Sequence, residues 1–187
     1  MTTVEHFEAE YEASPDPWGY RTSAYEQAKY AATLAACGPG PFQSALELGG
    51  SIGVFSARLA PRCRRLTTID YSPTAVRRAR AALAPYPQAR ALLGAVPEDL
   101  PEDTFDLVVA SETLYYLDAD ALARALDALG ERTAPGARLV CVHWRPPGPE
   151  RPLTAVHVHD EVRRQTWLRR LISECRPEYL LDVLERR

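Results

Sequence analysis

Short apolar runs alternate with helix-like segments along the chain from Ser44 onward. Apolar residues are nearly continuous in five of these runs, at 45–48, 66–69, 90–93, 105–110 and 138–144. Such runs are typical of strands that are buried on both faces. A looser alternation at 178–184 predicts a last strand at or near a sheet edge. The pattern as a whole predicts an α/β fold in which crossover helices flank a parallel sheet.

The first part of the chain differs from this pattern. Residues 1–43 carry no strand signal, but Ser23 and Glu26 form a capping box that predicts a helix over 24–36. We therefore expect a single domain overall, with 1–43 as a helical extension or lid in front of a main domain at 44–187.

Helix-end signals also occur within the main domain. Ser72 followed by Pro73 is typical of a helix start, and apolar residues then recur on one face. A second helix is expected to begin near Asp118 and to stop at Gly130. The proline-rich stretch 145–154 cannot form regular structure, which predicts a loop over one end of the sheet.

Composition narrows the class of protein. The chain has 187 residues, 46% hydrophobic and 25% charged, so a single hydrophobic core can stabilise it. Its net charge of −3 argues against nucleic-acid binding, which usually needs a basic surface. No apolar run approaches the ~20 residues of a membrane helix, and the acidic N-terminus does not resemble a secretory signal. We expect a cytoplasmic protein.

The cysteines give no metal signal. Cys37, Cys63, Cys141 and Cys175 are scattered without a C-x-x-C spacing, which favours buried or semi-buried reduced thiols over a zinc or redox site. We expect no bound metal.

A glycine-rich loop points to a nucleoside ligand. Gly49, Gly50 and Gly53 lie between a predicted strand and a predicted helix, where glycine lets the backbone turn tightly and approach a ligand. The next predicted strand ends in Asp70, whose carboxylate can accept hydrogen bonds from ribose hydroxyls. The carboxyl ends of adjacent parallel strands meet at one sheet edge, so both features belong to one expected site.

The charge beside this loop discriminates between nucleoside cofactors. Glu47 lies two residues before Gly49, and Ser51 stands where a dinucleotide fingerprint has its middle glycine. An anionic side chain fits poorly beside a pyrophosphate and suits a cationic ligand. This favours S-adenosylmethionine, whose sulfonium and ammonium groups are both positive.

Several stretches resemble a known family. The residues named above, with the F-D-L-V-V run at 105–109, resemble class I S-adenosylmethionine-dependent methyltransferases. A closer similarity is to the NodS-type nodulation N-methyltransferases and their bacterial relatives. It rests on D-P-W-G-Y-R-T-S-A-Y-E-Q-A-K-Y (16–30), E-L-G-G-S-I-G-V-F (47–55), S-E-T-L-Y-Y-L (111–117), V-H-W-R (142–145) and P-L-T (152–154).

The resemblance implies a Rossmann-like seven-stranded sheet, mostly parallel with one antiparallel strand and flanked by helices. The cofactor would lie across the carboxyl ends of the first strands, with S-adenosylhomocysteine as product. Because Ala95 follows Gly94 where the family has Asp, the residue that contacts adenine stays open. The family resemblance implies the following cofactor-binding residues: Glu47, Gly49, Gly50, Ser51, Gly53, Asp70, Tyr71, Val96, Pro97, Glu98 and Ser111.

Methyl transfer is an in-line displacement that depends mainly on positioning, and an amine acceptor must lose a proton before it attacks. Glu112 and His143 are the leading candidates for the base, and Tyr115 is a further catalytic candidate. The alternatives are that Glu112 caps the following helix and that His143 is satisfied inside the sheet. The segment after the proline-rich loop and the aromatic N-terminal segment are expected to contribute to the acceptor site or a lid. The candidates there are Trp18, Tyr20, Tyr25, Trp144, His157 and His159.

The predicted function is therefore methylation of a small molecule, with an amino sugar or glycan amine as the preferred acceptor on the family resemblance alone. O-methylation of a small metabolite remains an alternative. A nicotinamide-dependent oxidoreductase is a second, although the Y-x-x-x-K formed by Tyr25 and Lys29 precedes the glycine loop instead of following it. A non-catalytic nucleoside-binding domain is a third. Monomer and homodimer both stay open.

Overall fold

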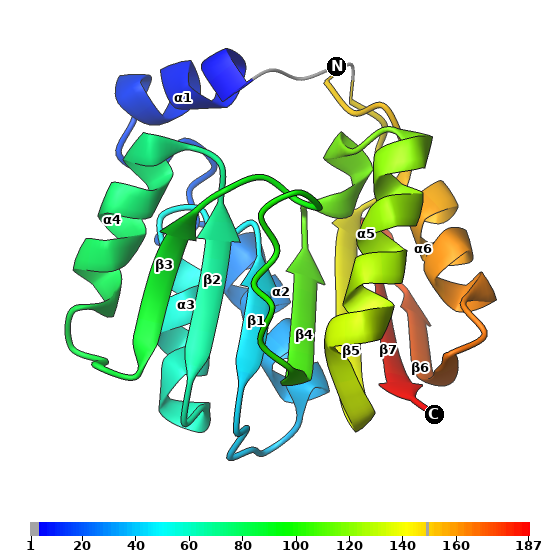
Figure 1. Cartoon of the computed structure of the whole chain (residues 1–187). Helices are drawn as coiled ribbons and strands as arrows, with labels where there is room; N and C mark the ends of the chain where they lie inside the picture. The colour runs from blue at the N-terminus through cyan, green and yellow to red at the C-terminus, as the bar shows by residue number, and fades with distance from the viewer. Residues whose placement is uncertain (1–3, 149) are drawn as a thin grey trace.

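The computed structural model describes residues 4–148 and 150–187 and contains one seven-stranded sheet in the order β3-β2-β1-β4-β5-β7-β6 (Figure 1). Strands β1 to β5 pair in parallel, and β7 pairs antiparallel with both β5 and β6. This confirms the expected sheet with a single antiparallel strand. The strands are β1 (Ala45–Leu48), β2 (Leu66–Asp70), β3 (Ala89–Leu93), β4 (Phe105–Ser111), β5 (Thr133–Trp144), β6 (Leu168–Cys175) and β7 (Tyr179–Arg186).

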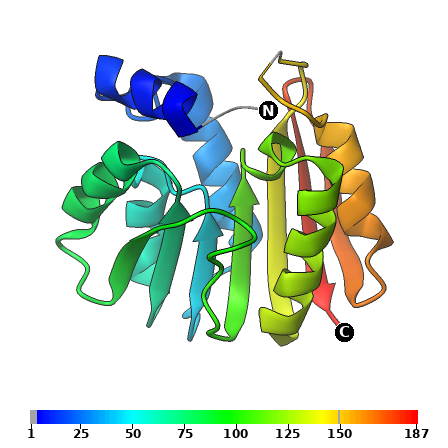
Figure 2. The same cartoon turned by 45° about the horizontal axis from the view of Figure 1, so that its top comes forward.

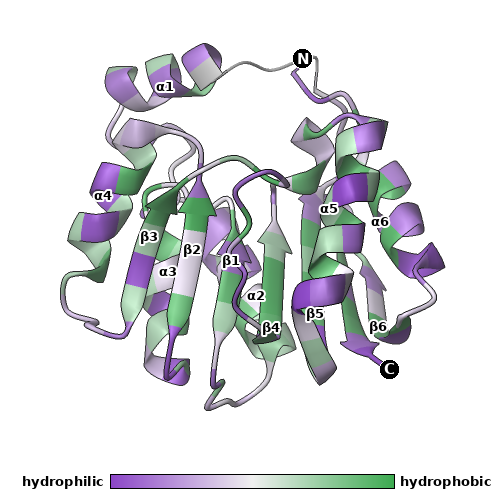
Figure 3. Cartoon of the chain, viewed as in Figure 1, coloured by the Kyte–Doolittle hydropathy of each residue, from purple (hydrophilic) through white to green (hydrophobic). Residues whose placement is uncertain are grey.

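Helices cover both faces of the sheet, and alternate residues of the strands pack against each layer. One core cluster joins the sheet to α2, α3 and α4, and the other joins it to α5 and α6. Figure 3 shows the strands as mainly hydrophobic, whereas the helices carry hydrophilic stretches. The helices are α1 (Val4–Ala13), α2 (Ala24–Cys37), α3 (Val54–Leu59), α4 (Pro73–Leu83), α5 (Ala119–Arg132) and α6 (Ala155–Arg164), with short 3₁₀ turns η1 (Ala60–Arg62) and η2 (Leu114–Tyr116).

The helix α1 lies above the carboxyl ends of the strands, as both views show (Figures 1 and 2). It packs mainly on α4. Phe7 and Tyr11 of α1 are buried in a small separate cluster with Ile52 and Ala75. The expected N-terminal extension is thus helical, and its first helix covers the sheet edge at which the nucleoside site was predicted.

The expected end of one helix was wrong. Helix α5 does not stop at Gly130 but continues to Arg132. Gly130 is part of the helix and packs against the Trp167 ring, and β5 begins at Thr133, directly after the helix.

The strand expected at or near a sheet edge is β7, which lies beside the edge strand β6. The other edge strand is β3, where only Ala91 is buried, although the run at 90–93 was expected to be buried on both faces. Sequence patterning missed β6, because its side chains between Arg169 and Ser173 are all exposed and arginines interrupt its apolar residues.

The thiols fit their expectation except at one position. Cys37, Cys63 and Cys141 are buried, whereas Cys175 on the edge strand is exposed. Among the described residues, no three acidic, histidine or cysteine side chains converge into a set that could hold a metal ion. The described helices include none that is both long and apolar enough to cross a membrane.

Candidate functional site

A cavity of about 640 Å³ lies at the carboxyl ends of the parallel strands, beneath α1 and beside α2. Its walls come from the ends of β1, β2 and β4, from the loops after β3 and β5, and from the N-terminal helices. Segments that are far apart in the sequence thus share one concave site, in the crevice where open α/β sheets usually bind ligands.

The loop after β1 has the backbone that its glycines predict. Gly49 has φ of 69°, and a Cβ there would lie 2.3 Å from the Thr113 Oγ1 atom. Gly53 caps α3 with φ of 79°, where a Cβ would meet the Ala79 backbone of α4 at 2.8 Å. Gly49, Gly50 and Ser51 line the cavity, whereas Gly53 is absent from its walls. Gly53 therefore serves the packing of α3 on α4, and its contact with a cofactor stays a prediction.

Glu47 is a buried carboxyl group in the wall of the cavity. Its side chain is 3% exposed, and its Oε2 accepts a hydrogen bond of 2.5 Å from the Ser56 hydroxyl of α3. Burial raises the pKa of Glu47 to about 7, because desolvation penalises the charged form more than the hydroxyl stabilises it. The site therefore holds an acidic group that a cationic ligand would help to ionise.

Asp70 stands at the end of β2 with both carboxylate oxygens held by the backbone. The Ser51 amide donates to Oδ2 at 2.8 Å, and the Ser72 amide donates to Oδ1 at 3.0 Å. Burial raises the pKa of Asp70, while these amide hydrogen bonds oppose that rise. Each carboxylate oxygen can accept more than one hydrogen bond, so Asp70 keeps acceptor capacity for a hydroxylated ligand.

The side of the cavity near β3 holds three of the four residues expected beside adenine and its ribose. Tyr71, Val96 and Glu98 line the cavity, and Pro97 is absent from its walls. The Phe7 ring of α1 meets the Tyr71 ring edge-to-face at 5.7 Å between centroids. This wall is thus aromatic and apolar with one acidic side chain.

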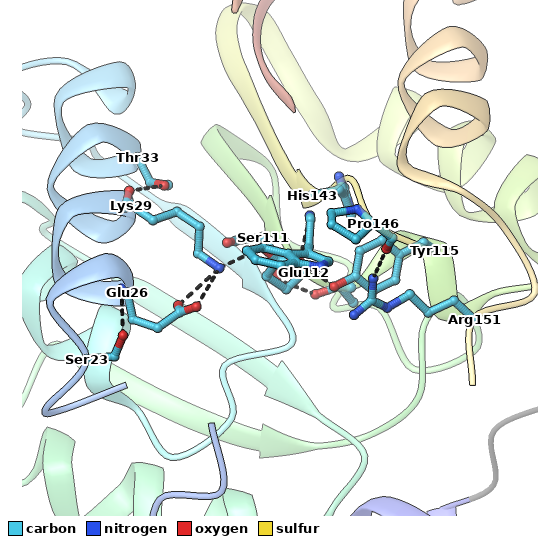
Figure 4. Close-up of polar contacts among 12 residues, drawn as sticks. Ser23, Glu26, Lys29, Thr33, Ser111, Glu112, Tyr115, His143, Pro146 and Arg151 are labelled. Carbon is cyan, nitrogen blue, oxygen red and sulfur yellow. Dashed lines mark hydrogen bonds and ion pairs between the residues drawn. The ribbon is translucent and has the colours of Figure 1, made fainter. Parts of the chain in front are cut away.

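Glu112, directly after β4, lines the cavity and is the centre of a polar network (Figure 4). Its Oε1 lies 2.7 Å from the Lys29 Nζ atom, and its Oε2 accepts the Trp144 amide at 2.9 Å and the Tyr115 hydroxyl. The backbone of Glu112 has φ of 56°, a left-handed conformation that non-glycine residues rarely adopt. Three donors and a strained backbone fix this carboxylate, and Ser111 lines the cavity beside it.

Lys29 is a site residue that the sequence did not predict. It comes from α2, is 3% exposed, and bridges Glu112 to Glu26, whose Oε2 lies 3.0 Å away. Its pairing with Tyr25 in the Y-x-x-x-K spacing offered no reason to place it here. The available signal was compositional, because Lys29 is the single lysine of an arginine-rich chain.

Aromatic residues from the N-terminal segment close the cavity. Trp18, Tyr20 and Tyr25 line it together with Trp144 at the end of β5, and their role at an acceptor or in a lid stays a prediction. The Tyr11 hydroxyl of α1 donates to the Ser51 hydroxyl of the glycine loop at 2.7 Å. The helix that covers the cavity is therefore bonded directly to the loop beneath it.

A carboxylate also fixes α1 to the N-terminus of α4. Glu8 accepts hydrogen bonds from the Ser72 hydroxyl at 2.5 Å and the Thr74 amide at 3.2 Å, and from the Thr74 hydroxyl. These hydrogen bonds lower the pKa of Glu8, and Arg77 adds to the lowering. A carboxylate at a helix N-terminus also interacts favourably with the helix dipole.

The three histidine candidates lie outside the cavity. His143 and His159 are fully buried, and His157 is exposed on α6. The His143 Nε2 atom accepts the Leu114 amide at 3.2 Å, and burial holds the pKa of His143 well below its usual range. A base must reach the proton it removes, so this geometry gives His143 no base role and gives His157 and His159 no contact with an acceptor in this cavity.

Comparisons with known proteins show the family of this chain. A family model described as nodulation protein S (NodS) matches residues 4–144. Nodulation protein S of Sinorhizobium fredii is 35% identical over 130 residues, which cover 68% of this chain and 60% of that protein. Nodulation protein S of Rhizobium tropici is 36% identical over 130 residues, which cover 68% and 55%. The chain thus spans about 60% of the length of such curated relatives.

A solved structure extends the likeness to the whole chain. It is the N-methyltransferase NodS from Bradyrhizobium japonicum WM9 in complex with S-adenosyl-L-homocysteine. Its TM-score is 0.90 at 26% sequence identity, and the match covers 100% of this chain and 99% of that chain. Its fold therefore includes the strands and helices that follow residue 144 as well as those before it.

Proposed function

Because this chain belongs to the NodS family, we propose that it is an S-adenosylmethionine-dependent N-methyltransferase of a small molecule. The observation that carries the proposal is one cavity in which Glu47, the glycine loop and Asp70 face Glu112 and its donors. The first group suits a nucleoside with cationic groups, and the second suits a neutral or cationic amine. A methyl donor and an acceptor can thus lie in the same enclosure.

The residues present fit this cofactor. Asp70 keeps acceptor capacity for ribose hydroxyls, and Glu47 is a buried acid whose hydrogen-bond donor, the Ser56 hydroxyl, is uncharged. The wall made by Tyr71, Val96 and Glu98 would hold the adenine. When bound, S-adenosylmethionine supplies an electrophilic methyl group on its sulfonium. The chain's own contribution is to bind, orient and exclude water.

An amine acceptor fits the charge of the cavity. Its walls include seven carboxylate side chains and three basic ones, so the site attracts a cationic or neutral acceptor over an anionic one. Glu112 is the group we propose for the acceptor nitrogen. Its carboxylate has spare acceptor capacity on Oε1, which can take an N–H hydrogen bond and receive the amine's proton.

We propose an amino sugar or glycan amine as the preferred acceptor. The similar NodS structure is that of an N-methyltransferase, which favours nitrogen over oxygen as the methylated atom. The aromatic side chains of Trp18, Tyr20, Tyr25 and Trp144 offer flat surfaces for the apolar face of a sugar. O-methylation is the nearest alternative, and paired amine and hydroxyl acceptors separate the two.

We further propose that 1–43 works as a lid over a methyltransferase domain at 44–187. The contacts of Tyr11 and Glu8 with the glycine loop and α4 support this division, because they join α1 to the edge where the cofactor would lie. A lid excludes water from the reacting groups and thereby strengthens electrostatic interactions among them.

Calorimetric titration with S-adenosylhomocysteine tests the cofactor assignment, with oxidised and reduced nicotinamide dinucleotides as controls. We expect binding in the micromolar range for S-adenosylhomocysteine alone. Binding of a nicotinamide cofactor in its place would overturn the proposed chemistry. Binding of S-adenosylhomocysteine without turnover of any acceptor would favour a non-catalytic nucleoside-binding domain.

A further inference from the structure

Three buried polar side chains form a line of hydrogen bonds behind the cavity. His143 of β5, His159 of α6 and Asp182 of β7 are each 0% exposed. The His143 Nδ1 atom lies 3.1 Å from His159 Nε2, and His159 Nδ1 lies 2.6 Å from Asp182 Oδ2. Arg163 reaches the same Asp182 oxygen at 2.8 Å. We call His143, His159 and Asp182 the histidine relay.

The contacts of the histidine relay allow one arrangement of protons. The His143 Nε2 atom accepts the Leu114 amide, so the neutral His143 ring carries its proton on Nδ1 and donates it to His159. His159 accepts on Nε2 and therefore donates from Nδ1 to the Asp182 carboxylate. Asp182 thus supports the tautomer of His143 through two hydrogen bonds, with His159 between them. The bonds from His159 and Arg163 lower the pKa of Asp182, which keeps it an acceptor.

The His143 end of the relay contacts the 112–116 segment, which carries the polar network around Glu112. Leu114 is the first residue of η2, and its amide has no partner within that turn. The His143 ring also meets the Tyr115 ring edge-on at 5.1 Å, and Tyr115 donates its hydroxyl to Glu112. Glu112 itself needs a left-handed backbone to present its carboxylate. Figure 4 shows His143 beside Tyr115 and Glu112.

We propose that the histidine relay is a positioning device, which fixes the 112–116 segment so that Glu112 and Tyr115 face the acceptor. The acceptor role of Glu112 and Tyr115 rests on the function proposed above. The hydrogen bonds of the histidine relay do not depend on that function. His159 and Asp182 lie beyond the part of the chain that the family model matches. They are positioning residues, because neither lines the cavity.

A purely structural role explains the relay less well. Buried polar groups of this kind can often be replaced by apolar side chains of similar size without loss of stability. The histidine relay instead runs in one direction, from the Asp182 carboxylate at one end to the backbone amide of Leu114 at the other. Such a layout sets the tautomer of a histidine in the way that carboxylates behind a metal site set those of histidine ligands.

Histidine ring NMR of the uniformly ¹⁵N-labelled protein tests the relay without any assay of turnover. We expect the neutral Nδ1–H tautomer for both His143 and His159, and slow hydrogen exchange at the Leu114 amide. A neutral Nε2–H tautomer at His143 would overturn the proposal, because that nitrogen could not accept from Leu114. This result would leave the methyltransferase assignment unaffected.

Two substitutions at one position separate positioning from packing. His159→Phe keeps a ring but removes the acceptor, whereas His159→Gln keeps an acceptor for the His143 proton. We expect His159→Phe to lower kcat for an amine acceptor by about tenfold or more and to speed exchange at Leu114, with the S-adenosylhomocysteine Kd within about twofold of wild type. His159→Gln should restore most of both losses. Val156→Ala, at an exposed position on the same helix, is the matched control.

Equal kcat and equal Leu114 exchange in His159→Phe and wild type would reduce the relay to a structural feature. If neither protein turns over any amine, the function proposed above fails, and the tautomers and Leu114 exchange still decide the relay. If His159→Phe does not fold, the wild-type tautomers together with the kcat of His143→Gln decide it. In His143→Gln the side-chain amide can still accept from Leu114 and donate to His159, so the proposal predicts that most of kcat is kept. A loss of kcat beyond about tenfold in this variant would contradict the relay.

Discussion

Glu112 shows how a single residue can combine strain, charge and placement. Its carboxylate accepts from Lys29, Tyr115 and the Trp144 amide, which are drawn from three different elements. The sequence identified Glu112 as a candidate because it follows a predicted strand. It could not identify Lys29 as the partner, since the contact joins positions 83 residues apart through the packing of α2 on the sheet.

Substitution of Glu112 tests its role at the acceptor. Glu112→Gln keeps the size of the side chain but replaces one acceptor oxygen with a donor, which loses the carboxylate that would take the amine's proton. We expect kcat for an amine to fall by about a hundredfold, within the usual range for a lost acid or base group. Steady-state kinetics measures this, with exposed Glu131→Gln on α5 as control. Unchanged kcat would remove Glu112 from the reaction.

Asp70 offers a test of the cofactor half of the site. A hydrogen bond to a charged group contributes roughly 1.5 to 3 kcal/mol, so Asp70→Ala should raise the S-adenosylhomocysteine Kd at least about tenfold. Calorimetric titration gives this Kd directly. Asp103→Ala, at a surface ion pair with Arg90, should leave it unchanged. Equal affinities of Asp70→Ala and wild type would exclude Asp70 from the cofactor site.

The raised pKa of Glu47 predicts a pH dependence of binding. Glu47 has a pKa of about 7 in the folded protein against 4.5 in the unfolded chain, so the folded state binds the proton more tightly between these values. The contribution of Glu47 to stability is therefore present at low pH and is lost as pH rises through about 7. A cationic cofactor favours the charged form of Glu47. The affinity of the protein for this cofactor should therefore rise with pH, whereas the contribution of Glu47 to stability falls.

We expect the affinity for S-adenosylmethionine to rise about tenfold between pH 6 and pH 8, as Glu47 ionises. Titrations at several pH values measure this, and buffers of different ionisation enthalpy should reveal the released proton. Glu47→Gln should bind with a much flatter pH profile. A wild-type profile that is equally flat would show that Glu47 does not face the cationic part of the ligand.

At the scale of elements, periodicity and end signals predicted the strands that are buried on both faces. The first strand was located at its observed bounds, Ala45–Leu48, and the helix after Ser23 was extended by one residue only. Exposed elements escaped detection, because β6 and α1 have few buried positions to reveal a period. The lid contacts of α1 also depend on tertiary pairing, as between Glu8 and Ser72, which local patterns do not encode.

The Glu8 contacts predict how α1 governs access to the cavity. Glu8→Ala removes three hydrogen bonds between α1 and the start of α4, so hydrogen exchange in α1 should accelerate and S-adenosylhomocysteine should dissociate several times faster. Exchange mass spectrometry and stopped-flow displacement measure the two effects. Glu10→Ala, at an exposed position on the same helix, is the control. Unchanged dissociation with faster exchange would separate α1 from the gating of the site.

At the scale of the molecule, the sheet brings the two halves of the site to one edge. β1 lies between β2 and β4, so the glycine loop is flanked by Asp70 on one side and Glu112 on the other. The sequence predicted the meeting of the glycine loop and Asp70 from the parallel fold, and it placed Glu112 at the acceptor after the family resemblance had been recognised. For His143 the sequence left open a base in the site and a histidine satisfied inside the sheet, since strand alternation gives a residue's face but not the partners that bury it there.

The reaction proposed for this protein is the transfer of a methyl group to an amine. The most direct measurement is mass spectrometry of products after incubation with S-adenosylmethionine labelled in its methyl group and a glucosamine oligosaccharide with free amines, beside its fully N-acetylated counterpart. We predict one labelled methyl group on the free-amine oligosaccharide, located on nitrogen by fragmentation, and none on the acetylated one. Label on oxygen in both oligosaccharides would contradict N-methylation, and label in neither would contradict the amino-sugar acceptor.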